Sequence, residues 1–359
     1  LHLSIRRQRQ MCIRDSLLDV QQLDALVILS DYNRRYLSDF TGTSGALIIS
    51  KNNYQLITDF RYIEQATNQA TKFNIIKRSG GLIEAIVEII NHEQFNHVGF
   101  EGHLVSYDTY QTLDQSKAKL ISIGNEIEKI REIKTPEEIE KIKYAAKIVD
   151  DTYNYVLDIA KVGMTERELK SKLEAKMLEL GADGPSFDTI VASGYRGALP
   201  HGVASDKVIE QGDMITLDFG AYYRGYCSDI TRTFAIGEPD SKMKDIYNIV
   251  LNSQIKAINE IKAGMTVAEA DALSRDYIES HGYREAFGHS LGHGIGLDIH
   301  EGPLLSKNAK GIIQVNNCVT IEPGIYVDGL GGVRIEDDIL ITENGCEVFT
   351  KCTKDLIIL

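Results

Sequence analysis

The sequence lacks long hydrophobic runs and contains little cysteine. No 18 consecutive residues are apolar, and no apolar segment is typical of a secretory signal, so neither a membrane-spanning helix nor secretion is expected. The five cysteines are odd in number and include no C-x-x-C pair, which argues against a disulfide framework. These absences predict a reduced protein in the cytoplasm.

Positive charge is also scarce. The chain carries 39 lysines and arginines against 52 acidic residues, a net charge of -13, so nucleic acids and anionic membranes are not expected as partners. With 359 residues, 43% of them hydrophobic, the chain can bury a sizeable core, and its length predicts two domains.

The first 16 residues, LHLSIRRQRQMCIRDS, differ from the rest of the chain. They are rich in arginine and show no sustained periodicity. We interpret residues 1–16 as a non-native or disordered extension, such as translated cloning sequence, and a basic targeting arm is the alternative. The fold argument therefore begins at residue 17.

Five ionisable residues in the second half of the chain each lie in an apolar or glycine-rich stretch. A buried charge there costs several kcal/mol unless it is metal-bound, paired or neutralised. One such carboxylate alone is more often a hydrogen-bonded turn residue, but four carboxylates and one imidazole together suit two hard divalent cations, such as Mn²⁺, Co²⁺ or Zn²⁺. A single histidine among oxygen ligands argues against a structural zinc site. The five are Asp218, Asp229, His293, Glu322 and Glu336.

The order and motifs of these five residues resemble the pita-bread metallopeptidases, most of all their aminopeptidase P and prolidase branch. Asp218 is followed eleven residues later by Asp229, and the other three lie in GHGIG, IEPG and GGVRIED. Further matching stretches are SFDTIVASG (186–194), ALPHG (198–202), SDITRTF (228–234) and GLDIHEGP (296–303). The resemblance implies a metallo-exopeptidase that cleaves short peptides with proline at the second position. It also implies that the enzyme binds two divalent ions, with Mn²⁺ expected first, and that it is a homodimer.

The first domain is expected over residues 17–130 and has a mixed pattern. Short apolar runs at ALVILS, SGALIIS, YQLITD and VGFEG read as strands, and RYIEQATNQA and GLIEAIVEIINH read as helices. Alternating strands and helices predict an α/β domain. This stretch resembles the creatinase-like N-terminal domain of the same family, which does no chemistry there but covers the active site and often forms the dimer contact.

The catalytic domain is expected over residues 135–359. Thr135 and Glu138 predict a capping box with Pro136 in the first helical turn, and apolar residues from Ile139 to Val156 then follow a helical spacing. GMTERELKSKLEAKMLELG (163–181) and GMTVAEADALSRDYIESHG (264–282) repeat a threonine capping box and a closing glycine. The repeat predicts two pseudo-symmetric halves, and a coincidental likeness of two ordinary capped helices is the alternative. The overall class is therefore α/β (α+β), with a creatinase-like domain followed by a pita-bread domain.

The pattern also places the five ligands. MITLDFG and CSDITRTFAI read as two strands of a hairpin, so Asp218 and Asp229 are expected at a cross-strand distance of roughly 5 Å. Glu322 and Glu336 are expected to repeat this arrangement on IEPGIYV and GGVRIED. Cys227, close to Asp229, is interpreted as a small core residue rather than a reactive thiol.

Three further histidines match family positions that bind substrate or stabilise the tetrahedral intermediate. They are His201 in LPHG, His289, four residues before His293, and His300 in GLDIHE. A structural role is the alternative for each of them, because a lone histidine near an apolar run is usually hydrogen-bonded within the fold. The resemblance thus predicts that the three act on the substrate.

Two arginines are implied as substrate-binding or positioning residues. Arg334 would fix the orientation of a carboxylate ligand. Arg61, in LITDFRYIEQA, would clamp a peptide carboxylate bidentately. A solvated surface arginine is the alternative in both cases.

The expected mechanism is hydrolysis by water that two cations activate. Glu322 would carry the proton from this water to the leaving nitrogen, while His289 and His300 stabilise the oxyanion. A methionine aminopeptidase-like enzyme shares the five ligands but typically lacks a creatinase-like domain. A non-catalytic pita-bread binding protein should have lost ligands, and creatinase itself has the fold without them.

Overall fold

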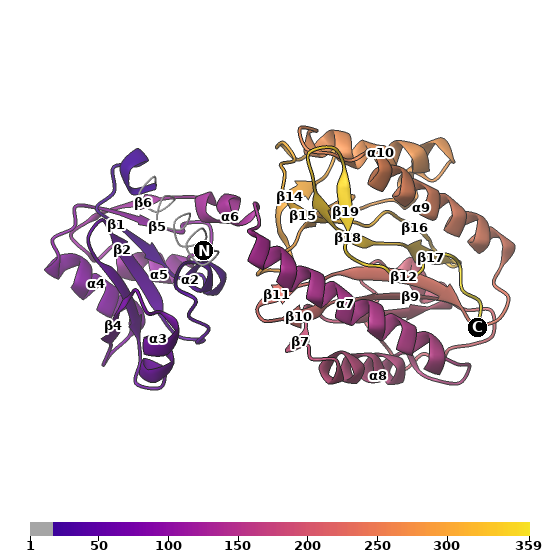
Figure 1. The fold of residues 1–359 in the computed structure, drawn as a ribbon, viewed down its shortest axis with the longest axis horizontal. Coiled ribbons are helices and arrows are strands. Elements are labelled where there is room, and N and C mark those ends of the chain that lie inside the picture. Colours follow the sequence, from indigo (N-terminus) through magenta and orange to yellow (C-terminus); the bar gives the residue numbers. More distant parts are fainter. Residues whose placement is uncertain (1–16) are drawn as a thin grey trace. The chain divides into compact units, whose positions relative to one another are not determined.

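The computed structural model describes residues 17–359 and divides into two compact units, one that ends at Ile130 and one spanning Arg131–Leu359 (Figure 1). The sequence-based interpretation of residues 1–16 lies outside the described residues. Among residues 17–359, no helix is both long enough and apolar enough to span a bilayer.

The first unit is built on a six-stranded mixed sheet with the order β4-β3-β2-β1-β5-β6. β1 pairs antiparallel with β2 and β2 with β3, while the remaining neighbours are parallel. The strands are β1 (Ala25–Ile28), β2 (Ala46–Ser50), β3 (Tyr54–Thr58), β4 (Asn74–Lys77), β5 (His97–Phe100) and β6 (Lys119–Ser122). The helices are α2 (Asp31–Ser38), α3 (Ile63–Gln69), α4 (Leu82–His92), α5 (Tyr107–Leu113) and α6 (Glu126–Arg131).

The core of this unit follows from the apolar runs. β1 and β2 are buried along their whole length, as expected for strands covered on both faces. Helix α4 packs Ile86 and Ile90 against them. The four predicted strands correspond to β1, β2, β3 and β5, and the two predicted helices to α3 and α4, so all six predictions are confirmed. The additional elements are α2, β4, α5, β6 and α6.

The second unit begins with α7 (Pro136–Ile159), whose capping box between Thr135 and Glu138 is confirmed, with Pro136 in the first turn. Its apolar stripe is buried from Ile139 to Val156. The repeat helices α8 (Glu166–Glu179) and α10 (Val267–Ser280) both carry the predicted threonine capping box. The glycines that follow them, Gly181 and Gly282, have positive φ values of 101° and 86°, a conformation in which a side chain would be strained.

The strands of this unit form two small sheets in each half. The first half contains the sheets β12-β9-β8 and β11-β10-β7, and the second half contains β14-β13-β15-β18-β19 and the hairpin β16-β17. First-half elements are β7 (Gly184–Pro185), β8 (Ile190–Ser193), the 3-10 turn η1 (Gly194–Ala198), β9 (Met214–Phe219), β10 (Ala221–Tyr223), β11 (Tyr226–Cys227) and β12 (Ile230–Ala235). Second-half elements are α9 (Ser241–Glu260), the 3-10 turn η2 (Arg284–Ala286), β13 (Gly292–Gly294), β14 (Glu301–Leu305), β15 (Cys318–Ile321), β16 (Gly324–Val327), β17 (Gly331–Arg334), β18 (Asp337–Ile341) and β19 (Cys346–Val348).

The two halves meet along β12 and the β17–β18 segment. The N–H of Glu336 donates to the carbonyl oxygen of Thr231 at 3.0 Å, and the Thr233 hydroxyl donates to the carbonyl oxygen of Arg334 at 3.0 Å. Helices α7 and α8 pack on first-half strands, while α9 and α10 cover second-half strands (Figure 1). Strands from both halves therefore share one interior, flanked by helices, as the pita-bread prediction requires.

Candidate metal centre

The first two candidate ligands come from the β9–β12 pair. Asp218 lies in β9 opposite Thr231, and Asp229 immediately precedes β12. Since side chains alternate along a strand, Asp229 and Thr231 share a face, and Asp218 and Asp229 are diagonal neighbours on it. The expected placement on adjacent strands is confirmed, but the two carboxylates are diagonal neighbours and not directly opposite each other.

The other three candidates come from second-half strands. His293 is the middle residue of β13, Glu322 follows β15, and Glu336 lies between β17 and β18. The predicted hairpin of IEPGIYV and GGVRIED is present as β16–β17, with Gly324 opposite Arg334. Both glutamates thus stand just outside this ladder.

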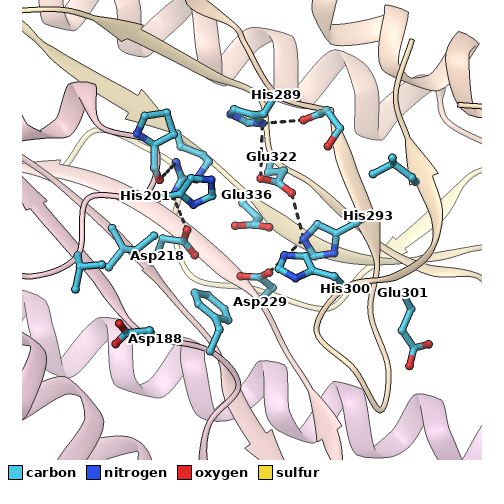
Figure 2. A pocket seen from close by; sticks show the side chains of 17 residues that line it. Asp188, His201, Asp218, Asp229, His289, His293, His300, Glu301, Glu322 and Glu336 are labelled. Atoms are coloured by element: carbon cyan, nitrogen blue, oxygen red, sulfur yellow. Dashed lines mark hydrogen bonds and ion pairs between the residues drawn. The ribbon is translucent and has the colours of Figure 1, made fainter. Parts of the chain in front are cut away.

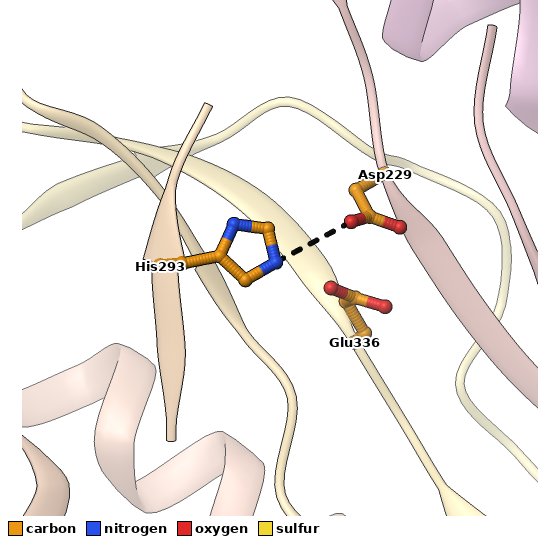
Figure 3. A group of neighbouring side chains, drawn as sticks. All are labelled: Asp229, His293 and Glu336. Atoms are coloured by element: carbon orange, nitrogen blue, oxygen red, sulfur yellow. Dashed lines mark ion pairs between the residues drawn. The ribbon is translucent and has the colours of Figure 1, made fainter. Parts of the chain in front are cut away.

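Three of the five side chains converge most closely. One donor atom each of Asp229, His293 and Glu336 lies within 4.8 Å of the other two (Figure 3). Nε2 of His293 is 3.6 Å from Oδ2 of Asp229 and 3.4 Å from Oε1 of Glu322. Asp218 lines the same cavity, so all five side chains surround one space (Figure 2).

Burial dominates the electrostatics of this cluster. It raises the pKa of Asp229 and Glu336 well above the usual carboxyl range, and neighbouring carboxylates add to the effect. It also raises the pKa of Glu322 to about 8, although Arg334 opposes the rise. Burial lowers the pKa of His293, which favours the neutral imidazole that binds metals.

Two oxygens in this cluster have no hydrogen-bond donor. Oδ1 of Asp229 and Oε1 of Glu336 are buried without a partner, a costly state for a carboxylate. The other oxygen of Glu336, Oε2, accepts a hydrogen bond from the Thr231 hydroxyl at 2.7 Å, which orients this carboxylate. Oxygen and imidazole donors that converge on one space fit a pair of divalent cations.

Arg334 connects the cluster to its surroundings. Its guanidinium pairs with Oδ2 of Asp218, donates to the Tyr326 hydroxyl at 2.6 Å, and donates through Nε to Oγ1 of Thr231 at 3.0 Å. It also donates to the carbonyl oxygen of Pro200 at 3.2 Å. The buried guanidinium therefore fixes Asp218 from one side, as is usual for residues behind a metal ligand.

The three predicted substrate-binding histidines all line the same cavity of about 680 Å³ (Figure 2). His289 lies in its wall, with Nε2 2.8 Å from the Tyr326 hydroxyl, and burial lowers its pKa to about 4. The His300 ring packs edge-on against His293 with centroids 4.5 Å apart. His201 and His300 are both exposed, whereas His289 is partly buried. The lining residues are Phe187, Asp188, Ile190, Pro200, His201, Val203, Asp218, Asp229, His289, Ser290, His293, His300, Glu301, Leu304, Glu322, Arg334 and Glu336.

Arg61 belongs to the first unit, and its contacts there are with neighbouring residues of that unit. Its guanidinium donates to both carboxylate oxygens of Asp59, at 2.9 and 2.8 Å, and its side chain is 58% exposed. Cys227 is buried, with a pKa raised by burial, which agrees with a core thiol.

The sequence reasoning missed three residues that support the site. Tyr326 joins His289 to Arg334, and Asp338 accepts a hydrogen bond from the Asp229 N–H. Glu301 is bound by Arg131 and Lys134. Tyr326 and Asp338 lie in the IEPGIYV and GGVRIEDDIL stretches that also contain Glu322 and Glu336. Their proximity in sequence to these candidate ligands could have predicted a supporting role.

Comparison with known families assigns most of the chain. The model of metallopeptidase family M24 matches residues 140–343, which include all five candidate ligands. The creatinase/prolidase N-terminal domain matches residues 14–133.

Individual relatives match over nearly the whole chain. An uncharacterised peptidase, YqhT, of Bacillus subtilis is 48% identical over 94% of this chain and 96% of its own length. A solved Xaa-Pro dipeptidase from Bacillus anthracis has a TM-score of 0.95 and 48% identity, covering 99% of this chain and 100% of that one. An X-Pro aminopeptidase from Thermotoga maritima has a TM-score of 0.88 and 40% identity, covering 94% of this chain and 98% of that one.

Proposed function

Because the chain belongs to metallopeptidase family M24, we propose that it hydrolyses the peptide bond between an N-terminal residue and proline with the help of two divalent metal ions. The names of its relatives support the substrate class, since the Bacillus anthracis structure is an Xaa-Pro dipeptidase and the Thermotoga maritima structure an X-Pro aminopeptidase. The metal ligands would be Asp218, Asp229, His293, Glu322 and Glu336.

One observation carries this proposal. Asp229 and Glu336 each have one buried carboxylate oxygen that accepts no hydrogen bond. Both lie beside His293, and burial lowers the pKa of this imidazole and so favours its neutral form. Without cations, the carboxyls avoid mutual repulsion by retaining protons. Cations would replace those protons, which couples the binding of metal to the release of protons.

A bound cation pair would supply Lewis acidity, polarising the scissile carbonyl and acidifying water. The chain's own groups would perform the remaining steps. Glu322, whose oxygens lie 3.4 Å from His293 Nε2 and 4.0 Å from His289 Nδ1, would carry a proton to the leaving proline nitrogen. His289 and His300 would hydrogen-bond the oxygen on which charge develops.

The rest of the lining suits a short peptide. Phe187, Ile190 and Leu304 provide apolar contacts, while His201 adds a polar group. The substrate's α-amino group would meet the acidic cluster, which restricts cleavage to N-termini. The match to the creatinase/prolidase N-terminal domain favours this function over that of a methionine aminopeptidase-like enzyme, and the intact ligand set disfavours a non-catalytic binding protein.

The finer parts of the proposal concern the metal, the assembly and the location. Mn²⁺ is the first choice because hard carboxylate oxygens dominate the donor set. A homodimer is proposed because the first domain matches the creatinase/prolidase N-terminal domain, a domain type that often forms the dimer contact. A cytoplasmic location is proposed from the pattern of cysteine use, and Cys227, Cys318, Cys346 and Cys352 are free thiols.

The test is an assay of Gly-Pro against an Xaa-Pro-Pro tripeptide, run on protein with a measured metal content. Hydrolysis that requires two metal ions per chain is expected for at least one of the two substrates, and the faster one identifies a dipeptidase or an aminopeptidase. Two bound metals with no cleavage of either peptide would contradict the proposed function.

A further inference from the structure

Two loops in the second unit each carry a histidine that lines the cavity, and each loop is tied to a repeat helix by a fully buried carboxylate. The first loop runs from Ser193 to Ser205 and contains His201, and the second runs from Phe287 to Leu291 and contains His289. The buried carboxylates are Glu166 on α8 and Asp271 on α10, both 0% exposed.

Glu166 binds both ends of the first loop. Its Oε1 accepts from the N–H and the hydroxyl of Ser193, at 2.8 and 2.9 Å, and its Oε2 accepts from the N–H and the hydroxyl of Ser205, at 3.0 and 2.7 Å. Arg196, inside the loop, pairs with Oε2 and also donates to the carbonyl oxygen of Val203 at 2.9 Å. The helix residue therefore satisfies five donors of the segment that presents His201.

Asp271 acts on the second loop both directly and through an arginine. Its Oδ1 accepts from the N–H of Leu291 at 3.0 Å. Its carboxylate holds Arg275 by two bonds, of 2.5 and 2.8 Å. Arg275 then donates to the carbonyl oxygen of Phe287 at 3.0 Å and to that of His289 itself at 2.7 Å.

These contacts are not a by-product of the internal repeat. Glu166 follows Thr165 directly, whereas Asp271 lies five positions after Thr266, the equivalent threonine. The residue equivalent to Glu166 in the second copy is Val267. The two halves thus place a loop-binding carboxylate at different positions of the repeat helix. A carboxylate that served only to stabilise the helix N-terminus would not need hydrogen-bond partners in a loop.

We propose that Glu166 and the Asp271–Arg275 pair are positioning residues for substrate-binding histidines, Glu166 for His201 and the pair for His289. The proposal rests on the proposed function, because the two histidines matter only if they meet a substrate. A displacement of about 1 Å at a binding group can cost on the order of 100-fold in rate, so the bonds to the loops bear directly on activity.

The test is a pair of double-mutant cycles. Glu166→Gln turns one carboxylate oxygen into an amide donor that faces other donors, and Asp271→Asn does the same on α10. Each is expected to lower kcat/KM by about 10-fold or more while two metal ions per chain remain bound. In a His201→Ala background, Glu166→Gln should cost less than about 2-fold, and the same should hold for Asp271→Asn in a His289→Ala background.

The crossed combinations are the matched controls. Glu166→Gln with His289→Ala, and Asp271→Asn with His201→Ala, should be additive. The capping glutamates Glu168→Gln and Glu269→Gln, exposed on the same two helices, should leave kcat/KM unchanged. Equal penalties with and without the partner histidine would overturn the proposal.

Hydrogen exchange separates this inference from the proposed function. Faster exchange of the amides of residues 193–205 in Glu166→Gln, and of Leu291 in Asp271→Asn, is expected whether or not the protein cleaves Xaa-Pro bonds. Wild-type protein that cleaves neither peptide would refute the function alone, and unchanged exchange would refute the loop contacts. If either variant fails to fold, Ser205→Ala and Arg275→Lys weaken the same contacts more gently and should give the same coupling pattern.

Discussion

The backbone N–H of Asp229 donates a 2.9 Å hydrogen bond to Oδ2 of Asp338, so a carboxylate of the second half fixes a candidate ligand of the first. Asp338 is 0% exposed, and burial raises its pKa well above the usual range. The neutral acid that this favours resembles an asparagine in shape and can still accept the bond.

Asp338→Asn is therefore expected to change the free energy of unfolding by less than about 1 kcal/mol, since the acceptor remains. Asp338→Ala should cost about 1–3 kcal/mol, because it leaves the Asp229 N–H buried without an acceptor. Urea unfolding of the metal-free variants measures both values. Equal losses in the two variants would show that the hydrogen bond is not the cause.

Removing one ligand should remove both metal and activity. Asp229→Ala or Glu336→Ala is expected to lower bound metal below two ions per chain and to abolish peptidase activity, because each residue supplies oxygens to the pair. Elemental analysis and peptide assays measure the two effects. Glu140→Ala, at a side chain that is 76% exposed on α7, is the control that should retain both. Full activity with two metals in either ligand variant would refute these assignments.

Glu301 should make the stability of the protein sensitive to acid. Burial would raise its pKa, but Lys134 and Arg131 hold it below the ordinary value of 4.5. The folded pKa is thus depressed, so the contribution of Glu301 is complete above about pH 4.5 and is lost as the pH falls through the lower folded value.

Glu301→Gln tests this dependence. At pH 7 the variant should lose about 3–5 kcal/mol, because two cations of 5% and 2% exposure lose their shared carboxylate. Below pH 4.5 the difference from wild type should shrink. Urea unfolding at pH 7 and pH 4 measures it, and Asp151→Asn in a surface pair should cost less than about 1 kcal/mol at either pH. A gap that does not depend on pH would contradict the assignment.

Arg61 is the sequence-based candidate for binding the substrate's carboxylate. If its guanidinium clamps a peptide carboxylate, Arg61→Ala should raise KM for short Xaa-Pro substrates by about 10–100-fold, equivalent to roughly 1.4–2.7 kcal/mol, with kcat and metal content unchanged. Arg61→Lys keeps the charge without the fork and should give an intermediate KM. An unchanged KM in both variants would restrict Arg61 to its bonds with Asp59.

Features encoded by neighbouring residues could be predicted from the sequence. The capping box at Thr135, its copies at Thr165 and Thr266, and the closing glycines Gly181 and Gly282 depend only on residues within a few turns of helix. Four of the six strands of the first unit, β1, β2, β3 and β5, followed in the same way from their apolar runs. These signals fixed the elements and the repeat.

The register of Asp218 and Asp229 could not be predicted in this way. The segment between the two strands of the expected hairpin forms β10 and β11, and β10 also pairs with β7. The N–H of Cys227 donates to the carbonyl oxygen of Gly296 at 2.8 Å, far along the chain. Such contacts between residues far apart in the sequence determine the register of β9 and β12. The roles of Tyr326, Asp338 and Glu166 depend on similar contacts and therefore could not be predicted from neighbouring residues.

The division of the ligands between the two halves has a consequence for synthesis of the chain. The ribosome synthesises the two ligands of the first half before the three ligands of the second half. The hydrogen bond from the Glu336 N–H to the carbonyl oxygen of Thr231 can form only after the second half has emerged from the ribosome. A nascent chain that ends within the first half therefore holds two of the five ligands. Peptidase activity should appear abruptly, late in translation, so a ribosome that stalls early releases no partly active protease.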